Sequence, residues 1–183
     1  MTCVADSTVR VEEFCAAMRR LAGAVNIITA RHEDRMAGMT ATAVCSVCAD
    51  PPTLLVCINR RAATHAAVLA SGAFCVNILR AEDHAVSIAF GGAVSPEERF
   101  HGREWRRLQT GAPVFAGALC SFDCHVSERM TRGTHSVFLG EIQAIAFGRH
   151  GRPLLYADGS FARLAGIEHA ERLPEGTDAW GFW

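Results

Sequence analysis

The chain has 183 residues, of which half are hydrophobic and one fifth are charged, and its formal net charge is −1. These values are typical of one globular domain, and they exclude a disordered chain and the basic surface of a nucleic-acid-binding protein. No stretch approaches the roughly 18 apolar residues that span a membrane, and residues 1–10 lack an export signal, so we expect a cytoplasmic protein without membrane contact.

A helix is predicted first, over residues 11–22. Val11, Phe14, Met18 and Leu21 recur at helical spacing and Gly23 follows, which favours an amphipathic helix that lies on the core. Short β-rich runs come next, separated by turn residues at 32–38 and 50–52. We expect strands over residues 24–30, 39–47, 53–59 and 74–79.

Two short connecting helices are predicted in the middle of the chain, over residues 64–71, where Thr64 can act as the N-terminal cap, and over residues 82–90. Residues 90–111 have no clear period, but they contain Phe100 and Trp105 as apolar anchors. We therefore expect an ordered excursion near the functional site.

The remaining strands are predicted over residues 119–128, 136–147 and 153–156. Because no strand alternates regularly with a long helix, the pattern predicts a mainly β fold, an antiparallel barrel of about six strands with flanking short helices. Residues 1–166 are expected to form this domain. Residues 167–183, which end in Trp180-Gly181-Phe182-Trp183, are expected to form a C-terminal tail.

Eight cysteines are present, most of them inside apolar runs such as residues 54–58 and 74–76. Without an export signal, they are expected to be reduced side chains of the core. Cys45 and Cys48 have the spacing of a zinc-binding pair, but residues three apart on a strand point to opposite faces. We therefore expect no metal site.

The familiar nucleotide-binding motifs, a dinucleotide fingerprint or a glycine-rich phosphate loop, are absent from the sequence. Instead, residues 38–47 read Gly-Met-Thr-Ala-Thr-Ala-Val-Cys-Ser-Val, so that small hydroxyl side chains alternate with small apolar ones. Small side chains let a flat ring approach the backbone closely. Thr40, Thr42 and Ser46 would equally suit an ordinary half-buried strand.

This run, continued by residues 53–60, resembles the short-chain flavin reductases, which have a split β-barrel fold. The members that it resembles include the reductase partners of pyrimidine-utilisation and 4-hydroxyphenylacetate hydroxylase systems, which supply reduced flavin to a separate monooxygenase. Further similar segments occur in family order and together cover about residues 10–165: residues 25–29, 74–79, 90–92, 98–100, 121–124 and the motif Gly133-Thr134-His135.

The resemblance implies FMN or FAD as the flavin, NADH or NADPH as the reductant, and a set of flavin-binding residues. In the family, the Gly-x-His motif lies beside the nicotinamide, which makes His135 the candidate catalytic residue, although many members have Asp in place of Thr134. A histidine by itself would more often be an ordinary strand residue. The implied binding residues are Thr40, Ala41, Thr42, Ala43, Ser46, Cys57, Ile58, Asn59, Phe90, Phe100 and Gly133.

Thr64 has two interpretations that stay open. It either caps its helix or marks a helix N-terminus that attracts a phosphate of the bound cofactor.

The resemblance implies an NAD(P)H:flavin oxidoreductase, a homodimer with flavin sites at the subunit interface, that supplies a partner monooxygenase through diffusing reduced flavin. Hydride transfer needs stacked rings and excluded water, so the lack of an acid–base pair does not argue against an enzyme. Two alternatives remain: a flavoprotein reductase of another acceptor, such as a cobalt corrinoid, and a non-catalytic flavin-binding protein. His135 argues against the second, because it indicates a nicotinamide subsite.

Overall fold

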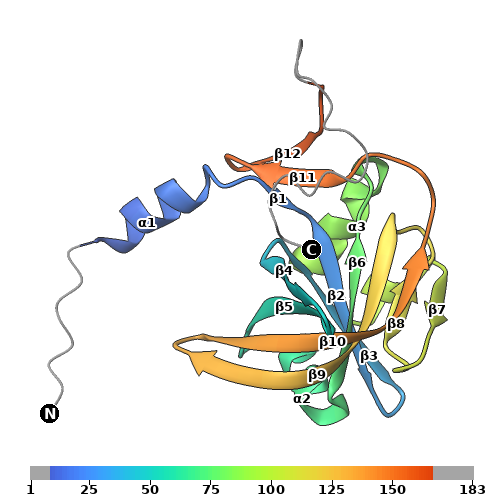
Figure 1. Cartoon of the computed structure of the whole chain (residues 1–183). Coiled ribbons are helices and arrows are strands. Elements are labelled where there is room, and N and C mark those ends of the chain that lie inside the picture. Colours follow the sequence, from blue (N-terminus) through green and yellow to red (C-terminus); the bar gives the residue numbers. More distant parts are fainter. Residues whose placement is uncertain (1–8, 167–183) are drawn as a thin grey trace, which may run out of the picture.

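A computed structural model describes residues 9–166, and its main elements are antiparallel strands (Figure 1). Seven strands form one sheet in the order β3-β2-β6-β9-β10-β5-β4, and every neighbouring pair is antiparallel. These strands are β2 (Asn26–His32), β3 (Arg35–Ala41), β4 (Val44–Ala49), β5 (Pro52–Asn59), β6 (Ala73–Ile78), β9 (Cys120–Arg132) and β10 (His135–Phe147).

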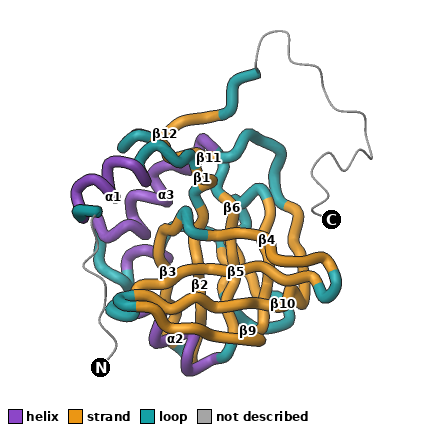
Figure 2. Tube along the Cα trace, turned by 60° about the vertical axis from the view of Figure 1, so that its left-hand side comes forward, coloured by secondary structure: helices purple, strands orange, loops and turns teal. Residues whose placement is uncertain are grey.

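The first and last strands of this sheet, β3 and β4, are consecutive in the chain, so the sheet curls until its edges meet (Figure 2). Only Thr42 and Ala43 separate the two strands, where a single strand over residues 39–47 was predicted. The backbone bends here because Thr42 O accepts a hydrogen bond from Val44 N (2.9 Å) and Ala43 O accepts one from Cys57 N (3.1 Å). The predicted antiparallel barrel is confirmed, but the predicted strand is two strands.

The core lies on both sides of β2, whose residues 26–30 are all buried. Because neighbouring residues of a strand point to opposite faces, Ile27 packs with Phe115 while Ile28 packs with Phe74 and Phe138 on the other side. Each such side chain stabilises the fold by about 1.5–3 kcal/mol when it is fully buried.

The connecting helices lie close to where the sequence predicted them. α2 (Ala63–Ser71) ends at Gly72, which adopts a left-handed conformation (φ 67°), and α3 (His84–Ile88) lies between a 3-10 turn at Ala81–Asp83 and a π-helical turn at Ala89–Ala93. The cap predicted at Thr64 is wrong. Ala62 occupies the cap position, and Thr64 is buried within the first turn, 2% exposed.

The excursion that follows is ordered, as predicted. It contains a 3-10 turn at Glu98–Phe100 and a small hairpin of β7 (Trp105–Arg107) and β8 (Pro113–Phe115). Trp105 packs against Phe90, Phe100 and Phe115, and its Nε1 donates a hydrogen bond to Phe100 O at 3.1 Å.

The first helix departs from the prediction. α1 (Val11–Met18) is shorter than expected and buries no residue, and Figure 1 shows that it projects away from the barrel. Val11, Phe14 and Leu21 remain 71, 57 and 68% exposed. The following strand, β1 (Gly23–Ala24), joins a separate small sheet with β11 (Leu154–Ala157) and β12 (Ser160–Arg163) at one end of the barrel. Helical spacing predicts an apolar face but does not say what covers it.

Two further findings concern only residues 9–166. Within them, no helix is both long and apolar enough to cross a membrane. The tail predicted for residues 167–183 lies outside the described residues.

Candidate active site

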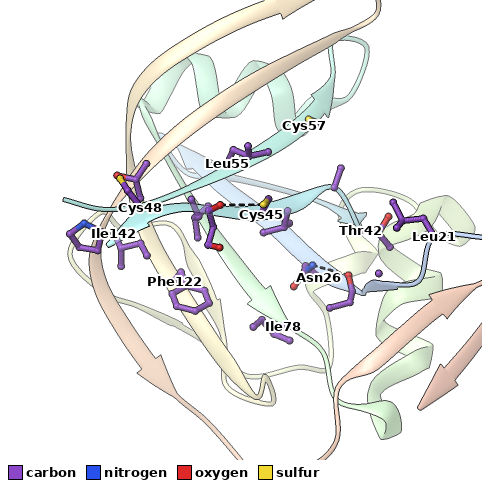
Figure 3. A pocket seen from close by; sticks show the side chains of 18 of the residues that line it. Leu21, Asn26, Thr42, Cys45, Cys48, Leu55, Cys57, Ile78, Phe122 and Ile142 are labelled. Atoms are coloured by element: carbon purple, nitrogen blue, oxygen red, sulfur yellow. Dashed lines mark hydrogen bonds between the residues drawn. The ribbon is translucent and has the colours of Figure 1, made fainter. Parts of the chain in front are cut away.

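A large apolar groove of about 880 Å³ opens beside the link between β3 and β4 (Figure 3). In Figure 3, Leu21 and Thr42 lie at one end and Ile142 lies at the other, with Cys45 between them. Leu55 of β5 also lines the groove. Its volume falls within the range of about 300–1,000 Å³ that is common for small-molecule sites.

The predicted flavin-binding run lies on the wall of this groove. Thr42, Ala43, Ser46 and Cys57 all line it. Gly23 approaches the same wall from the neighbouring segment, and a Cβ on this glycine would lie 3.2 Å from the Thr42 Cβ. The small side chains therefore leave the backbone accessible to a flat ring.

Thr40 and Ala41 face a second, smaller cavity of about 500 Å³, which Thr42 also borders. The Thr40 hydroxyl donates a hydrogen bond of 2.6 Å to Ser87 O of α3, which ties β3 to that helix. Phe161 of β12 also lines this cavity. The predicted run thus passes between two cavities, and Thr42 is shared by both.

His135 lies at the tip of the long β9–β10 hairpin, exposed to solvent. Gly133 has a φ of 56°, which fits the first position of a two-residue hairpin turn, and the Thr134 hydroxyl lies 2.9 Å from His135 Nδ1. His135 pairs directly with Asn59 of β5, so the two residues share a face of the sheet. Cys57, which lines the groove, is two residues from Asn59 on that same face, about 7 Å along the strand.

The other predicted residues lie away from the groove. Ile58 and Thr64 are buried. Phe90 and Phe100 belong to the aromatic cluster behind β3, where a Cβ on Gly38 would lie 2.6 Å from Phe90 Cε1 and 3.3 Å from Phe100 Cζ. These two rings therefore support the strand that carries Thr40, and their contact with a flavin stays a prediction.

Three arginines, Arg60, Arg129 and Arg132, lie at or next to the hairpin tip along the chain and through the strand register, and the sequence analysis missed this because arginines are scattered along the chain. Arg60 N donates a hydrogen bond of 2.9 Å to Thr134 O, and Arg132 pairs with His135. Arg60 and Arg129 also act on the buried His65, since burial first and then these two positive charges lower the pKa of that histidine. None of the three arginines forms an ion pair within residues 9–166.

The cysteines only partly match the expectation of buried thiols. Cys75 and Cys124 are buried, and burial raises the pKa of Cys124 to about 12. Cys15 and Cys45 are exposed instead, because α1 stands off the barrel and Cys45 lines the groove. Across residues 9–166, no three His, Cys, Asp or Glu side chains gather as metal ligands do.

Residues 18–165 match the family model described as a flavin reductase like domain. The FMN reductase (NADH) RutF 2 of Methylorubrum extorquens is 47% identical over 141 residues, which cover 77% of this chain and 82% of that protein. A solved homologue of nitrilotriacetate monooxygenase component B, from Mycobacterium thermoresistibile, is 29% identical with a TM-score of 0.83, covering 93% of this chain and 95% of that one.

A third similarity is to BorF, the flavin reductase component of a bacterial two-component tryptophan halogenase. It is 30% identical with a TM-score of 0.77, covering 86% of this chain and 100% of that chain. These matches confirm the split β-barrel that the resemblance implied, and the chain belongs to the family of flavin reductase like domains.

Proposed function

We propose that this protein is an NADH-dependent flavin reductase that binds FMN in the groove beside Thr42. The observation that carries the proposal is that small residues of the β3–β4 link line an apolar groove of about 880 Å³. Family membership and the relative named FMN reductase (NADH) support both the reaction and the two substrates.

The chain's residues would bind and orient the reactants. Thr42, Ala43 and Ser46 leave room for the flavin ring, and the apolar wall excludes water. His135, on the same sheet face as Cys57, would position the nicotinamide, and the positive charges of Arg60 and Arg132 favour phosphate-bearing ligands near the hairpin tip. The ligands themselves supply the chemistry, which is hydride transfer from the nicotinamide to the flavin.

The reduced flavin would leave by diffusion and serve a monooxygenase or a related flavin-dependent enzyme. This part of the proposal is supported by the named roles of the structural neighbours, which are components of two-component monooxygenase and halogenase systems. A cytoplasmic location is consistent with the cysteines of residues 9–166, all of which are free thiols.

The direct test mixes the pure protein with NADH or NADPH and with FMN, FAD or riboflavin, and follows the nicotinamide absorbance. We expect oxidation of NADH that depends on added flavin, fastest with FMN. Absence of turnover with every combination, together with tight flavin binding, would favour the non-catalytic flavin-binding alternative.

The location of the flavin is tested by adding bulk to the groove. Replacing Thr42 or Ser46 by Leu should weaken flavin binding at least tenfold while the fold survives, because a ring stacked on the backbone tolerates little added volume. Ser160→Leu is the matched control, since Ser160 is exposed on β12 and lies outside the groove. Unchanged flavin affinity in both groove variants would remove these residues from the site.

We also propose a homodimer. The supporting observation is the exposed apolar surface of α1 and the adjoining groove, which Met18 and Leu21 both line. Light scattering at micromolar concentration should give twice the chain mass of 19.7 kDa. A fully active monomer would contradict this expectation.

A further inference from the structure

The tip of the β9–β10 hairpin is fastened to α2 by a buried pair of side chains. His65, in the first turn of α2, places its Nε2 atom 2.9 Å from the Ser136 hydroxyl of β10. The two residues are only 7 and 1% exposed. The Ser136 hydroxyl also lies 3.3 Å from the hydroxyl of Thr131 on β9, so a chain of hydrogen bonds joins the helix to both strands of the hairpin.

This fastening fixes the direction of His135. Ser136 and His135 are neighbours on one strand, so their side chains point to opposite faces of the sheet. With Ser136 held inward by His65, His135 points outward beside Asn59. A shift of the β10 register by one residue would turn Ser136 outward and His135 inward.

His65 is suited to a neutral connecting role. Burial and the charges of Arg60 and Arg129 lower its pKa, so the ring is uncharged at neutral pH. A neutral imidazole can either donate a hydrogen bond to the Ser136 hydroxyl or accept one from it. The ring also packs edge-on against Phe138, with centroids 5.4 Å apart, which restricts its rotation.

We propose that His65 is a positioning residue for His135, and that it acts through its hydrogen bond with Ser136. The inference rests on the proposed function, in which His135 orients the nicotinamide. It predicts that breaking the His65–Ser136 bond weakens the productive binding of NADH and leaves the flavin groove unaffected, because none of the residues that line the groove belongs to the hairpin tip at residues 131–136.

The experiment uses three variants and one control. His65→Phe keeps an aromatic ring against Phe138 but loses the hydrogen bond, whereas His65→Gln keeps a polar group close to the position of Nε2. Ser136→Ala removes the other partner of the bond. Ser121→Ala is the matched control. Like Ser136, Ser121 carries a buried hydroxyl, but it lies on β9 near the opposite end of the hairpin and donates its hydrogen bond to Asn77.

We expect His65→Phe and Ser136→Ala to raise the KM for NADH about three- to tenfold, which corresponds to the loss of one buried hydrogen bond. The flavin Kd should stay within twofold. His65→Gln should restore most of the KM, and Ser121→Ala should leave it unchanged. In a His135→Ala background, His65→Phe should have no further effect on the KM, because the two residues act in series.

A second measurement does not depend on turnover. Hydrogen exchange of the backbone amides at residues 134–137 should be several-fold faster in His65→Phe than in the parent, and exchange in β2 should be unchanged. Unchanged exchange at the tip would overturn the inference, and so would an equal rise of KM in His65→Gln or in Ser121→Ala. If the parent protein does not oxidise NADH, the proposed function fails, and faster exchange at the tip would still support the fastening by His65.

Discussion

Replacing Asn77 by Leu should cost a large part of the stability of this barrel. The Asn77 side chain donates hydrogen bonds to Ile27 O (3.1 Å) and the Thr29 hydroxyl (3.2 Å), and it accepts them from Phe115 N (2.7 Å) and the Ser121 hydroxyl (2.9 Å). The residue is fully buried. Leu has the same branched arrangement of side-chain heavy atoms, although its methyl groups are bulkier, and it leaves these groups without their partner. Each unpaired buried group costs about 1–3 kcal/mol.

Because the two hydroxyls can turn toward other acceptors, we expect a total loss of about 2–5 kcal/mol, which is a large share of the roughly 5–15 kcal/mol that stabilises a domain. Urea unfolding at a fixed protein concentration measures it. With an m-value of about 2 kcal/mol/M, the midpoint should fall by about 1–2.5 M.

The matched comparison is Ser121→Ala, which removes one of the hydrogen bonds of the Asn77 side chain and leaves its Oδ1 atom paired with Phe115 N. We expect this variant to lose only about 0.5–1.5 kcal/mol. If Asn77→Leu lost no more than Ser121→Ala, the side chain would not be the junction that joins β2, β6, β8 and β9, and the reasoning would be refuted.

Three further outcomes are expected. Gly140→Ala should destabilise the fold by about 1–3 kcal/mol in the same assay, because its Cβ would lie 2.7 Å from Phe74 Cε1. The pKa of His65 in the folded chain lies below its ordinary value of 6.5, so below about pH 6.5 the unfolded chain binds more protons than the folded chain. The stability that depends on neutral His65 should therefore be fully present above pH 6.5 and should fall as the pH drops below it. Urea unfolding at several pH values measures this dependence, and His65→Gln should reduce it. Iodoacetamide at pH 8, followed by mass spectrometry, should label the exposed Cys45 readily, and bound FMN should protect it. Cys124, whose pKa is raised to about 12, should react about a thousandfold more slowly than an ordinary thiol.

Much of the secondary structure and part of the candidate site followed from the sequence. The strands predicted over residues 53–59 and 74–79 agree with β5 and β6 to within one residue at each end. β-Branched and apolar side chains between turn residues indicate a buried or half-buried strand, and this signal lies within the segment itself. The run of small residues around Thr42 was likewise recognisable, and it does line the groove. Its composition carries the information, since small side chains leave space wherever the chain places them.

Relations between distant segments were decided only by the tertiary structure. His65 and Ser136 are 71 residues apart in the sequence, and their hydrogen bond exists because β10 pairs with β5 just before the chain enters α2. The arginines around the hairpin tip come together through the same register. The exposure of α1 is the opposite case, because its helical spacing was read correctly and its packing was not. Periodicity records which side chains share a face, whereas the partner of that face is set by strand pairing and chain path, which no local pattern contains.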